Sequence, residues 1–165
     1  MIREIGEQAC WSLRMPIALA ARVPMLAGFR IALDINRASQ EGERLAARLG
    51  PDEWLLCAPP ASANDLSIAI AAQLAGEHHS LVDVGHRYTA FGIEGAQAHV
   101  LLAAGCPIDL DPRVFGPGQA TRTLLGKAEI ILWRLAVGYR LECGRTFAPY
   151  VAAFLREAAR EFTVD

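Results

Sequence analysis

The residues with the strongest potential for metal chemistry in this sequence are its histidines. His78, His79, Asp83 and His86 lie within nine positions of one another. Metal ligands must converge, as two histidines four positions apart on one helix do, whereas adjacent histidines point in different directions in any regular element. The spacing therefore favours a solvated helix end running into a strand, and we expect no metal site here.

A nucleophile and paired carboxylates follow in the next segment. Cys106 comes seven residues after His99, and Asp109 and Asp111 stand close behind it. A reactive thiol needs a base within hydrogen-bond reach, but two helical turns separate side chains by about 10 Å. We expect Cys106 to be a buried cysteine that packs a helix end. The two aspartates fit an acid/base pair or a solvated turn, and no opposed position across a cleft is indicated.

The Gly116-Pro117-Gly118 stretch begins like a dinucleotide fingerprint. Thr121 stands where the third glycine belongs, and Pro117 removes a backbone N–H that a phosphate would need. We therefore read this stretch as a turn. No catalytic, cofactor-binding or metal-binding residue is assigned in this chain.

The composition narrows the class of protein. The 165 residues carry a formal net charge of −2, so no basic field exists to attract nucleic acid or an anionic membrane. The apolar stretch of residues 15–33 is interrupted by Arg22, Pro24 and Arg30, which a membrane-spanning helix does not tolerate. Glu4 and Glu7 occupy the place of the basic region of a signal peptide. We expect a soluble, unexported protein.

Four cysteines are widely and irregularly spaced, with no C-x-x-C motif: Cys10, Cys57, Cys106 and Cys143. Such spacing is typical of reduced, mostly buried thiols in a cytoplasmic protein. We expect no disulfide.

Hydrophobic periodicity predicts a mixture of helices and strands that do not alternate regularly. Helices are expected at residues 40–49, 62–74, 95–104 (with Gly105 as a left-handed stop) and 149–162, and strands at 30–35, 53–58, 81–84, 91–94, 121–125, 129–135 and 139–143. The fold class is therefore α+β, with mixed, largely antiparallel sheets and packed helices. The length fits a single compact unit over residues 1–165, or two small lobes at about 1–80 and 81–165.

Arg134 lies on an otherwise apolar strand face. Alternation places Ile131 and Trp133 on one face of this strand, and Leu132 and Arg134 on the other. The arginine is explained by a buried ion pair, by an edge that a partner covers, or by an internal strand whose arginine reaches solvent. These explanations stay open at this point.

Five stretches resemble a known family in order and spacing. They are residues 50–56 (GPDEWLL), 81–87 (LVDVGHR), 105–110 (GCPIDL), 122–134 (RTLLGKAEIILWR) and 145–151 (RTFAPYV). Together they resemble the gamma subunit of heterotetrameric sarcosine oxidase over about residues 50–162. The sequence departs from the family's usual residues at Gly85, at Gly144 and at the Ala152-Ala153 pair.

The resemblance implies a shortened fold related to the glycine-cleavage aminomethyltransferase, and a non-catalytic subunit. In that family the complex oxidatively demethylates sarcosine to glycine, passes the methyl carbon to tetrahydrofolate and forms hydrogen peroxide. The resemblance places FAD, FMN, NAD, tetrahydrofolate and zinc in other subunits and none in this chain. It implies alpha, beta and delta subunits as partners, chiefly alpha, in the cytoplasm.

Two alternatives to an oxidase subunit remain. One is a free-standing folate-binding or aminomethyl-transfer module, which would need a deep apolar pocket with a carboxylate, Asp83 being the only candidate. The other is an interaction protein unrelated to one-carbon metabolism, since a fold alone does not define a function.

Overall fold

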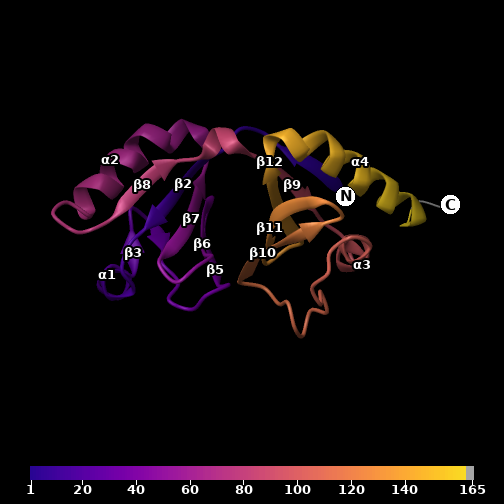
Figure 1. The fold of residues 1–165 in the computed structure, drawn as a ribbon, viewed down its shortest axis with the longest axis horizontal. Coiled ribbons are helices and arrows are strands. Elements are labelled where there is room, and N and C mark those ends of the chain that lie inside the picture. Colours follow the sequence, from indigo (N-terminus) through magenta and orange to yellow (C-terminus); the bar gives the residue numbers. More distant parts are fainter. Residues whose placement is uncertain (163–165) are drawn as a thin grey trace. The chain divides into compact units, whose positions relative to one another are not determined.

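A computed structural model describes residues 1–162 of the chain. The chain forms two compact units (Figure 1). One comprises Glu7–His86, and the other comprises Met1–Gly6 together with the chain from Arg87 onward. The chain therefore passes between the units twice, and its first strand belongs with the later residues.

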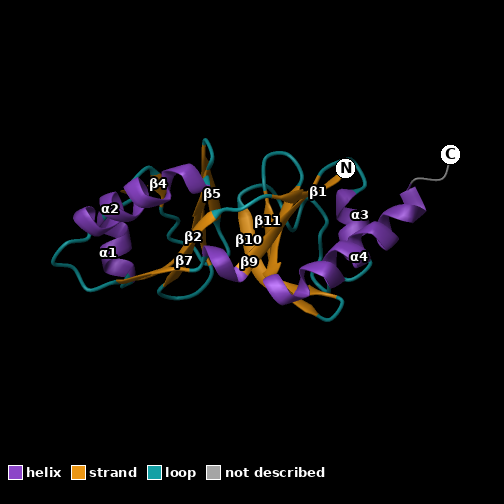
Figure 2. Ribbon diagram, turned by 90° about the horizontal axis from the view of Figure 1, so that it is seen from above, coloured by secondary structure: helices purple, strands orange, loops and turns teal. Residues whose placement is uncertain are grey.

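The unit Glu7–His86 is built on a five-stranded antiparallel sheet with the strand order β5-β6-β7-β2-β8. These strands are β5 (Ala38–Glu41), β6 (Arg44–Arg48), β7 (Glu53–Ala58), β2 (Ala9–Arg14) and β8 (Ser80–Asp83). The helices α1 (Ile17–Arg22) and α2 (Ala63–Gln73) lie on one side of this sheet (Figure 2). Alternate strand residues pack against them in a buried core that includes Trp11, Leu13, Trp54, Leu56, Leu66 and Ile70.

The helix predicted for residues 40–49 is wrong, because this segment is the hairpin of β5 and β6. Gly42 has a φ of +60°, and the two residues 42–43 connect Glu41 to its cross-strand partner Arg44. Leu45, Ala46 and Ala47 are all buried, so both faces of β6 are apolar and the alternation that marks a strand is hidden. Consecutive apolar residues then resemble one face of a helix.

The strand predicted for residues 30–35 is also largely wrong. Only β4 (Phe29–Arg30) forms, paired with β3 (Met25–Leu26). Ala27 and Gly28 connect them with φ values of 47° and 82°, the backbone of a tight hairpin turn. Asn36 also has a positive φ, of 63°, which turns the chain away from an extended path.

The other unit is a second five-stranded antiparallel sheet, with the order β1-β9-β12-β11-β10. Its strands are β1 (Ile2–Ile5), β9 (Tyr88–Ile93), β12 (Tyr139–Gly144), β11 (Ala128–Arg134) and β10 (Gln119–Leu125). The helices α3 (Ala98–Ala103) and α4 (Ala148–Ala159) share a core with one sheet face, to which Leu102, Leu125, Leu132, Leu141, Val151 and Leu155 contribute. Two antiparallel sheets with few helices confirm the α+β class.

The predicted hairpin of residues 129–135 and 139–143 is confirmed, with Leu132 opposite Leu141 in antiparallel register. The helix predicted at residues 149–162 is also confirmed as α4 followed by the 3-10 turn Arg160–Phe162. Gly105 does not have the predicted left-handed backbone. A side chain there would instead collide with the ring of Phe154, so glycine is needed for close packing against α4.

Candidate functional site

The sheet face away from α3 and α4 carries a row of chemically varied side chains. Cross-strand pairing aligns Arg122, Ile131 and Glu142 in one row, since Arg122 is opposite Ile131 and Ile131 is opposite Glu142. The next row contains Leu124 opposite Glu129. Because side chains alternate between faces, these residues project from the face that the helices leave uncovered.

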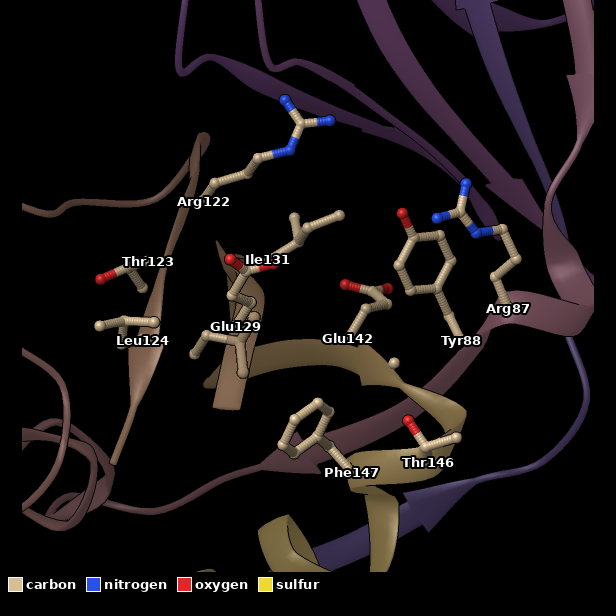
Figure 3. Close-up of a pocket in the computed structure, with 12 residues that line it drawn as sticks. Arg87, Tyr88, Arg122, Thr123, Leu124, Glu129, Ile131, Glu142, Thr146 and Phe147 are labelled. Atoms are coloured by element: carbon tan, nitrogen blue, oxygen red, sulfur yellow. The ribbon is translucent and has the colours of Figure 1, made fainter. Parts of the chain in front are cut away.

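A pocket of about 500 Å³ lies over these rows. Its lining includes Arg87 at the end of the 3-10 turn Gly85–Arg87, Tyr88 at the start of β9, and Thr146 and Phe147 from the 3-10 turn Arg145–Phe147. Figure 3 shows Glu142 between Tyr88 and Glu129, with Phe147 across from them. The volume lies within the range of roughly 300–1,000 Å³ that small-molecule pockets usually have.

Glu142 is the most deeply buried charged residue of the pocket, with 1% of its surface exposed. Its Oε1 accepts a hydrogen bond from Arg140 Nε at 2.5 Å, and its Oε2 accepts one from the Trp133 indole N–H. Burial raises the pKa of Glu142, and the charge of Arg140 opposes that shift. With both oxygens engaged, this carboxylate anchors the sheet and is poorly placed to serve as a catalytic base.

The rim of the pocket is partly apolar and partly charged. Leu124 and Phe147 are 42% and 43% exposed, and Arg87 and Glu129 are exposed beside them. Among the described residues that line the pocket there is no thiol and no imidazole. The lining offers charged and apolar contacts but no nucleophile with an adjacent base.

The Gly116-Pro117-Gly118 stretch leads into a strand, β10, and not into a helix. Gly118 has a φ of +82°, and its N–H donates to the carbonyl of Arg134 at 2.9 Å. Phosphate cradles of the dinucleotide type need free N–H groups at a helix N-terminus. The structure therefore gives this stretch the geometry of a turn.

The histidine-rich segment is spread over several local structures. His79 Nδ1 lies 2.9 Å from the carbonyl oxygen of Glu77, Asp83 accepts a hydrogen bond from the N–H of Gly85, and His86 is in a 3-10 turn. Within residues 1–162, no group of three or more His, Cys, Asp or Glu side chains is arranged to hold a metal ion. Asp83 belongs to the unit Glu7–His86 and does not line the pocket.

Cys106 and the two aspartates after it are occupied by local contacts. The Cys106 thiol lies 3.8 Å from the hydroxyl of Thr123. Asp109 accepts the N–H of Asp111, and Asp111 binds the Arg113 guanidinium through both of its oxygens. The hydrogen bonds from Arg113 hold the pKa of Asp111 below its usual value. The pair therefore forms a turn, not an acid/base couple across a cleft.

Arg134 makes its contacts within its own hairpin. Its guanidinium lies 4.9 Å from the centre of the Tyr139 ring and donates to the carbonyls of Leu135 and Gly138. The arginine thus closes the β11–β12 turn. The buried ion pair of this hairpin is Arg140–Glu142 instead. The sequence could have indicated this ion pair, because Arg140 and Glu142 are opposite charges at alternate positions of a predicted strand. Both lie on the sheet face of Trp133.

Comparison with solved structures defines the class of fold. The aminomethyltransferase T of the glycine cleavage system from Bartonella henselae superposes with a TM-score of 0.69 at 15% identity, over 93% of this chain and 44% of that one. At this level of identity the likeness shows the fold alone. The protein has an aminomethyltransferase-type fold, as the sequence resemblance implied.

The family is shown by a closer match. The model of the sarcosine oxidase gamma subunit family matches residues 14–161, and the chain belongs to this family. A heterotetrameric sarcosine oxidase from Corynebacterium sp. U-96, in complex with pyrrole 2-carboxylate, contains a chain that superposes with a TM-score of 0.86 at 26% identity, over 100% of this chain and 86% of that one.

Curated relatives agree with this assignment. A sarcosine oxidase subunit gamma from Arthrobacter sp. is 37% identical over 86 residues, which are 52% of this chain and 41% of the relative. One from Corynebacterium sp. strain P-1 is 30% identical over 118 residues, covering 71% of this chain and 57% of the relative. The match thus spans about half the length of these relatives.

In the described residues, no helix is long and apolar enough to cross a membrane.

Proposed function

We propose that this chain is the non-catalytic small subunit of a heterotetrameric sarcosine oxidase. The observation that supports this most directly is the family match over residues 14–161, together with the superposition on a chain of such an oxidase over the full length of this one. In the proposed complex, sarcosine is oxidatively demethylated to glycine, its methyl carbon passes to tetrahydrofolate and oxygen becomes hydrogen peroxide. The flavins, NAD, tetrahydrofolate and zinc bind to the other subunits.

The apolar rim of the pocket is the proposed contact for the partner, chiefly the alpha subunit. Leu124 and Phe147 expose large side chains beside the charged Arg87 and Glu129. Stable subunit interfaces combine a more apolar centre with a polar edge, and often bury more than about 2,000 Å². An exposed leucine and an exposed phenylalanine beside charged groups fit the centre and edge of such an interface.

Co-expression of the four subunits tests this role. The complex is expected to retain this chain through affinity capture of the alpha subunit, and its yield or activity is expected to fall when this chain is omitted. The purified chain alone is expected to be colourless and to consume no oxygen with sarcosine. A complex that assembles and works equally well without this chain would contradict the proposal, as would turnover by the chain alone.

Paired substitutions test the contact itself. Leu124→Asp and Phe147→Asp are expected to release the chain from the alpha subunit, because each buries a charge in the proposed interface. Val137→Asp is the matched control, since Val137 is 73% exposed in the β11–β12 turn and does not line the pocket. Thermal melting checks that each variant is folded. If the alpha subunit then retains all three variants equally, the rim is not the contact.

The size of the pocket supports a second candidate, a free-standing folate-binding module, although Asp83 lies outside the lining. About 500 Å³ beside Tyr88 and two arginines suits a pterin ring with a glutamate tail. Titration calorimetry of the isolated chain with tetrahydrofolate separates the two functions. The subunit role predicts no saturable binding, whereas the module predicts binding that Tyr88→Ala weakens.

A further inference from the structure

Two cysteines that are far apart in the sequence face each other in the sheet of the unit Glu7–His86. Cys10 in β2 is directly opposite Cys57 in β7. Their sulfur atoms lie 2.7 Å apart, well inside the ordinary contact distance of two non-bonded sulfurs. A disulfide bond is about 2.05 Å long, so the two sulfur atoms need to move only about 0.7 Å closer to reach bonding distance.

The backbone at this position suits a cross-strand bond. The carbonyl of Cys10 accepts the N–H of Val84 at 2.8 Å, so the polar groups of Cys10 are directed toward β8 and away from β7. Cys10 and Cys57 therefore form a non-hydrogen-bonded antiparallel pair, whose Cα atoms are typically about 4.5 Å apart. This separation lies within the range of about 4.4–6.8 Å that disulfides span.

The other two cysteines have different neighbours. The Cys106 sulfur contacts the Thr123 hydroxyl, and the Cys143 sulfur contacts the carbonyl of Thr89. Burial raises the pKa of the Cys143 thiol to about 11, which leaves little thiolate to react near neutral pH. The Cys10–Cys57 pair thus stands apart from them in geometry.

We propose that Cys10 and Cys57 are an oxidisable dithiol that closes to a disulfide between β2 and β7 when the protein meets a hydroperoxide. One thiol attacks the peroxide O–O bond and becomes a sulfenic acid, with release of water. The second thiol displaces hydroxide from that sulfur, and a proton completes a second water. Two thiols and one hydrogen peroxide thus give one disulfide and two waters, with two electrons passing from sulfur to oxygen.

The bond would join two adjacent inner strands of the sheet. β2 pairs with β7 on one side and β8 on the other, so a link between β2 and β7 fixes one of the two inner strand pairings of the sheet. The two thiols are only 2% and 1% exposed, so the oxidant reaches them when the sheet opens locally. Once closed, the bond restricts the unfolded chain between positions 10 and 57 and opposes further opening.

The test treats the purified full-length chain with hydrogen peroxide, then denatures it in N-ethylmaleimide and digests it with trypsin. A disulfide-linked pair of peptides, residues 4–14 and 49–87, is expected to grow with time and to disappear on reduction. The oxidised protein is expected to melt at least about 5 °C higher than the reduced one. Dithiothreitol is expected to reverse that shift.

Cys57→Ser and Cys143→Ser are the paired variants. Cys57→Ser is expected to lose both the linked peptides and the peroxide-induced rise in melting temperature, and to trap a dimedone-reactive sulfenic acid at Cys10. Cys143→Ser is expected to keep the linked peptides. The proposal is overturned if wild-type Cys10 and Cys57 both remain fully alkylated after peroxide treatment, or if oxidation yields only sulfinic acids or links between separate chains.

Discussion

The buried carboxyl group of Glu142 is hydrogen-bonded to Arg140 and Trp133, and its protonation links the stability of the fold to pH. Burial raises its pKa in the folded chain above the ordinary value of 4.5. The folded state then holds the proton to higher pH than the unfolded state does. This contribution to the free energy of unfolding is fully present below the unfolded pKa and is lost as pH rises through the folded pKa.

Glu142→Gln tests this linkage, because glutamine keeps an acceptor for Trp133 and does not titrate. The free energy of unfolding of the wild type, minus that of the variant, is expected to decrease as pH rises from about 4.5. Urea unfolding at a series of pH values measures this difference. Glu129→Gln is the control, since Glu129 is exposed. A difference that does not change with pH would show that burial does not raise the pKa of Glu142.

Gly85 and Gly144 have opposite surroundings. A side chain at Gly85 would place its Cβ 2.7 Å from the carbonyl oxygen of Gln8 and 3.3 Å from the nitrogen of Cys10. At Gly144 the nearest atom would be 3.9 Å away, on the Phe147 ring, and the backbone φ of −56° suits any residue. The first glycine is therefore required by packing, and the second is not.

We expect Gly85→Ala to lower the free energy of unfolding by about 1–3 kcal/mol, because the 3-10 turn Gly85–Arg87 that follows β8 must move away from the start of β2. Gly144→Ala should be neutral or raise it by about 0.4–1 kcal/mol, because alanine restricts the unfolded chain. Equilibrium unfolding of the two variants in parallel checks both values. Equal effects would contradict the difference in packing.

At the level of elements, the turn between β10 and β11 is held against α4. The N–H of Gly126 donates to the carbonyl of Gly105 at 2.9 Å, and the N–H of Lys127 donates to the hydroxyl of Tyr150 at 3.1 Å. Phe154 packs over Gly105, with no room for a Cβ between them. Two aromatic residues of one helix face thus position both the turn and the end of α3.

Gly105→Ala is expected to lower the free energy of unfolding by about 1–3 kcal/mol through a collision with Phe154. In a Phe154→Ala background the same substitution is expected to have a smaller effect, because the colliding ring is gone. Urea unfolding of the four proteins of this double-mutant cycle gives the coupling free energy. If the two effects simply add, the close packing of Gly105 against Phe154 is not the reason for glycine.

The elements differ in how far the sequence could predict them. β12 and α4 were predictable because each keeps one clean period in the sequence: apolar and charged residues alternate over residues 139–143, and α4 buries Val151 and Leu155 on one face. β11 is apolar on both faces, and it was predicted through the hairpin that it forms with β12. β6 was not, because Leu45, Ala46 and Ala47 are buried on both faces. The Cys10–Cys57 pair and the pocket depend on strand register between distant segments, which local patterns do not encode.

At the scale of the whole molecule, the chain donates its first strand to the unit formed by its later residues. β1 pairs with β9 along its whole length, from Ile2 opposite Ile93 to Ile5 opposite Ala90. Ile2 also packs against the core of that unit. Without β1, β9 would be the edge strand of this sheet, with no strand on its side away from β12. An open sheet edge promotes association with other chains.

Deletion of residues 2–6 is therefore expected to lower the melting temperature, measured by fluorescence, and to increase aggregation on heating, measured by light scattering.

A control lengthens the connection without removing the strand, by inserting two glycines after Gly6. Gly6 has open space around it, since an added Cβ there would meet no atom within 4 Å. Loop lengthening changes the closure entropy only slightly, so this insertion is expected to melt close to the wild type. If the deletion and the insertion behave alike, the connection matters and the β1–β9 pairing does not. If only the deletion is destabilised, the later unit depends on a strand that precedes the other unit in the chain.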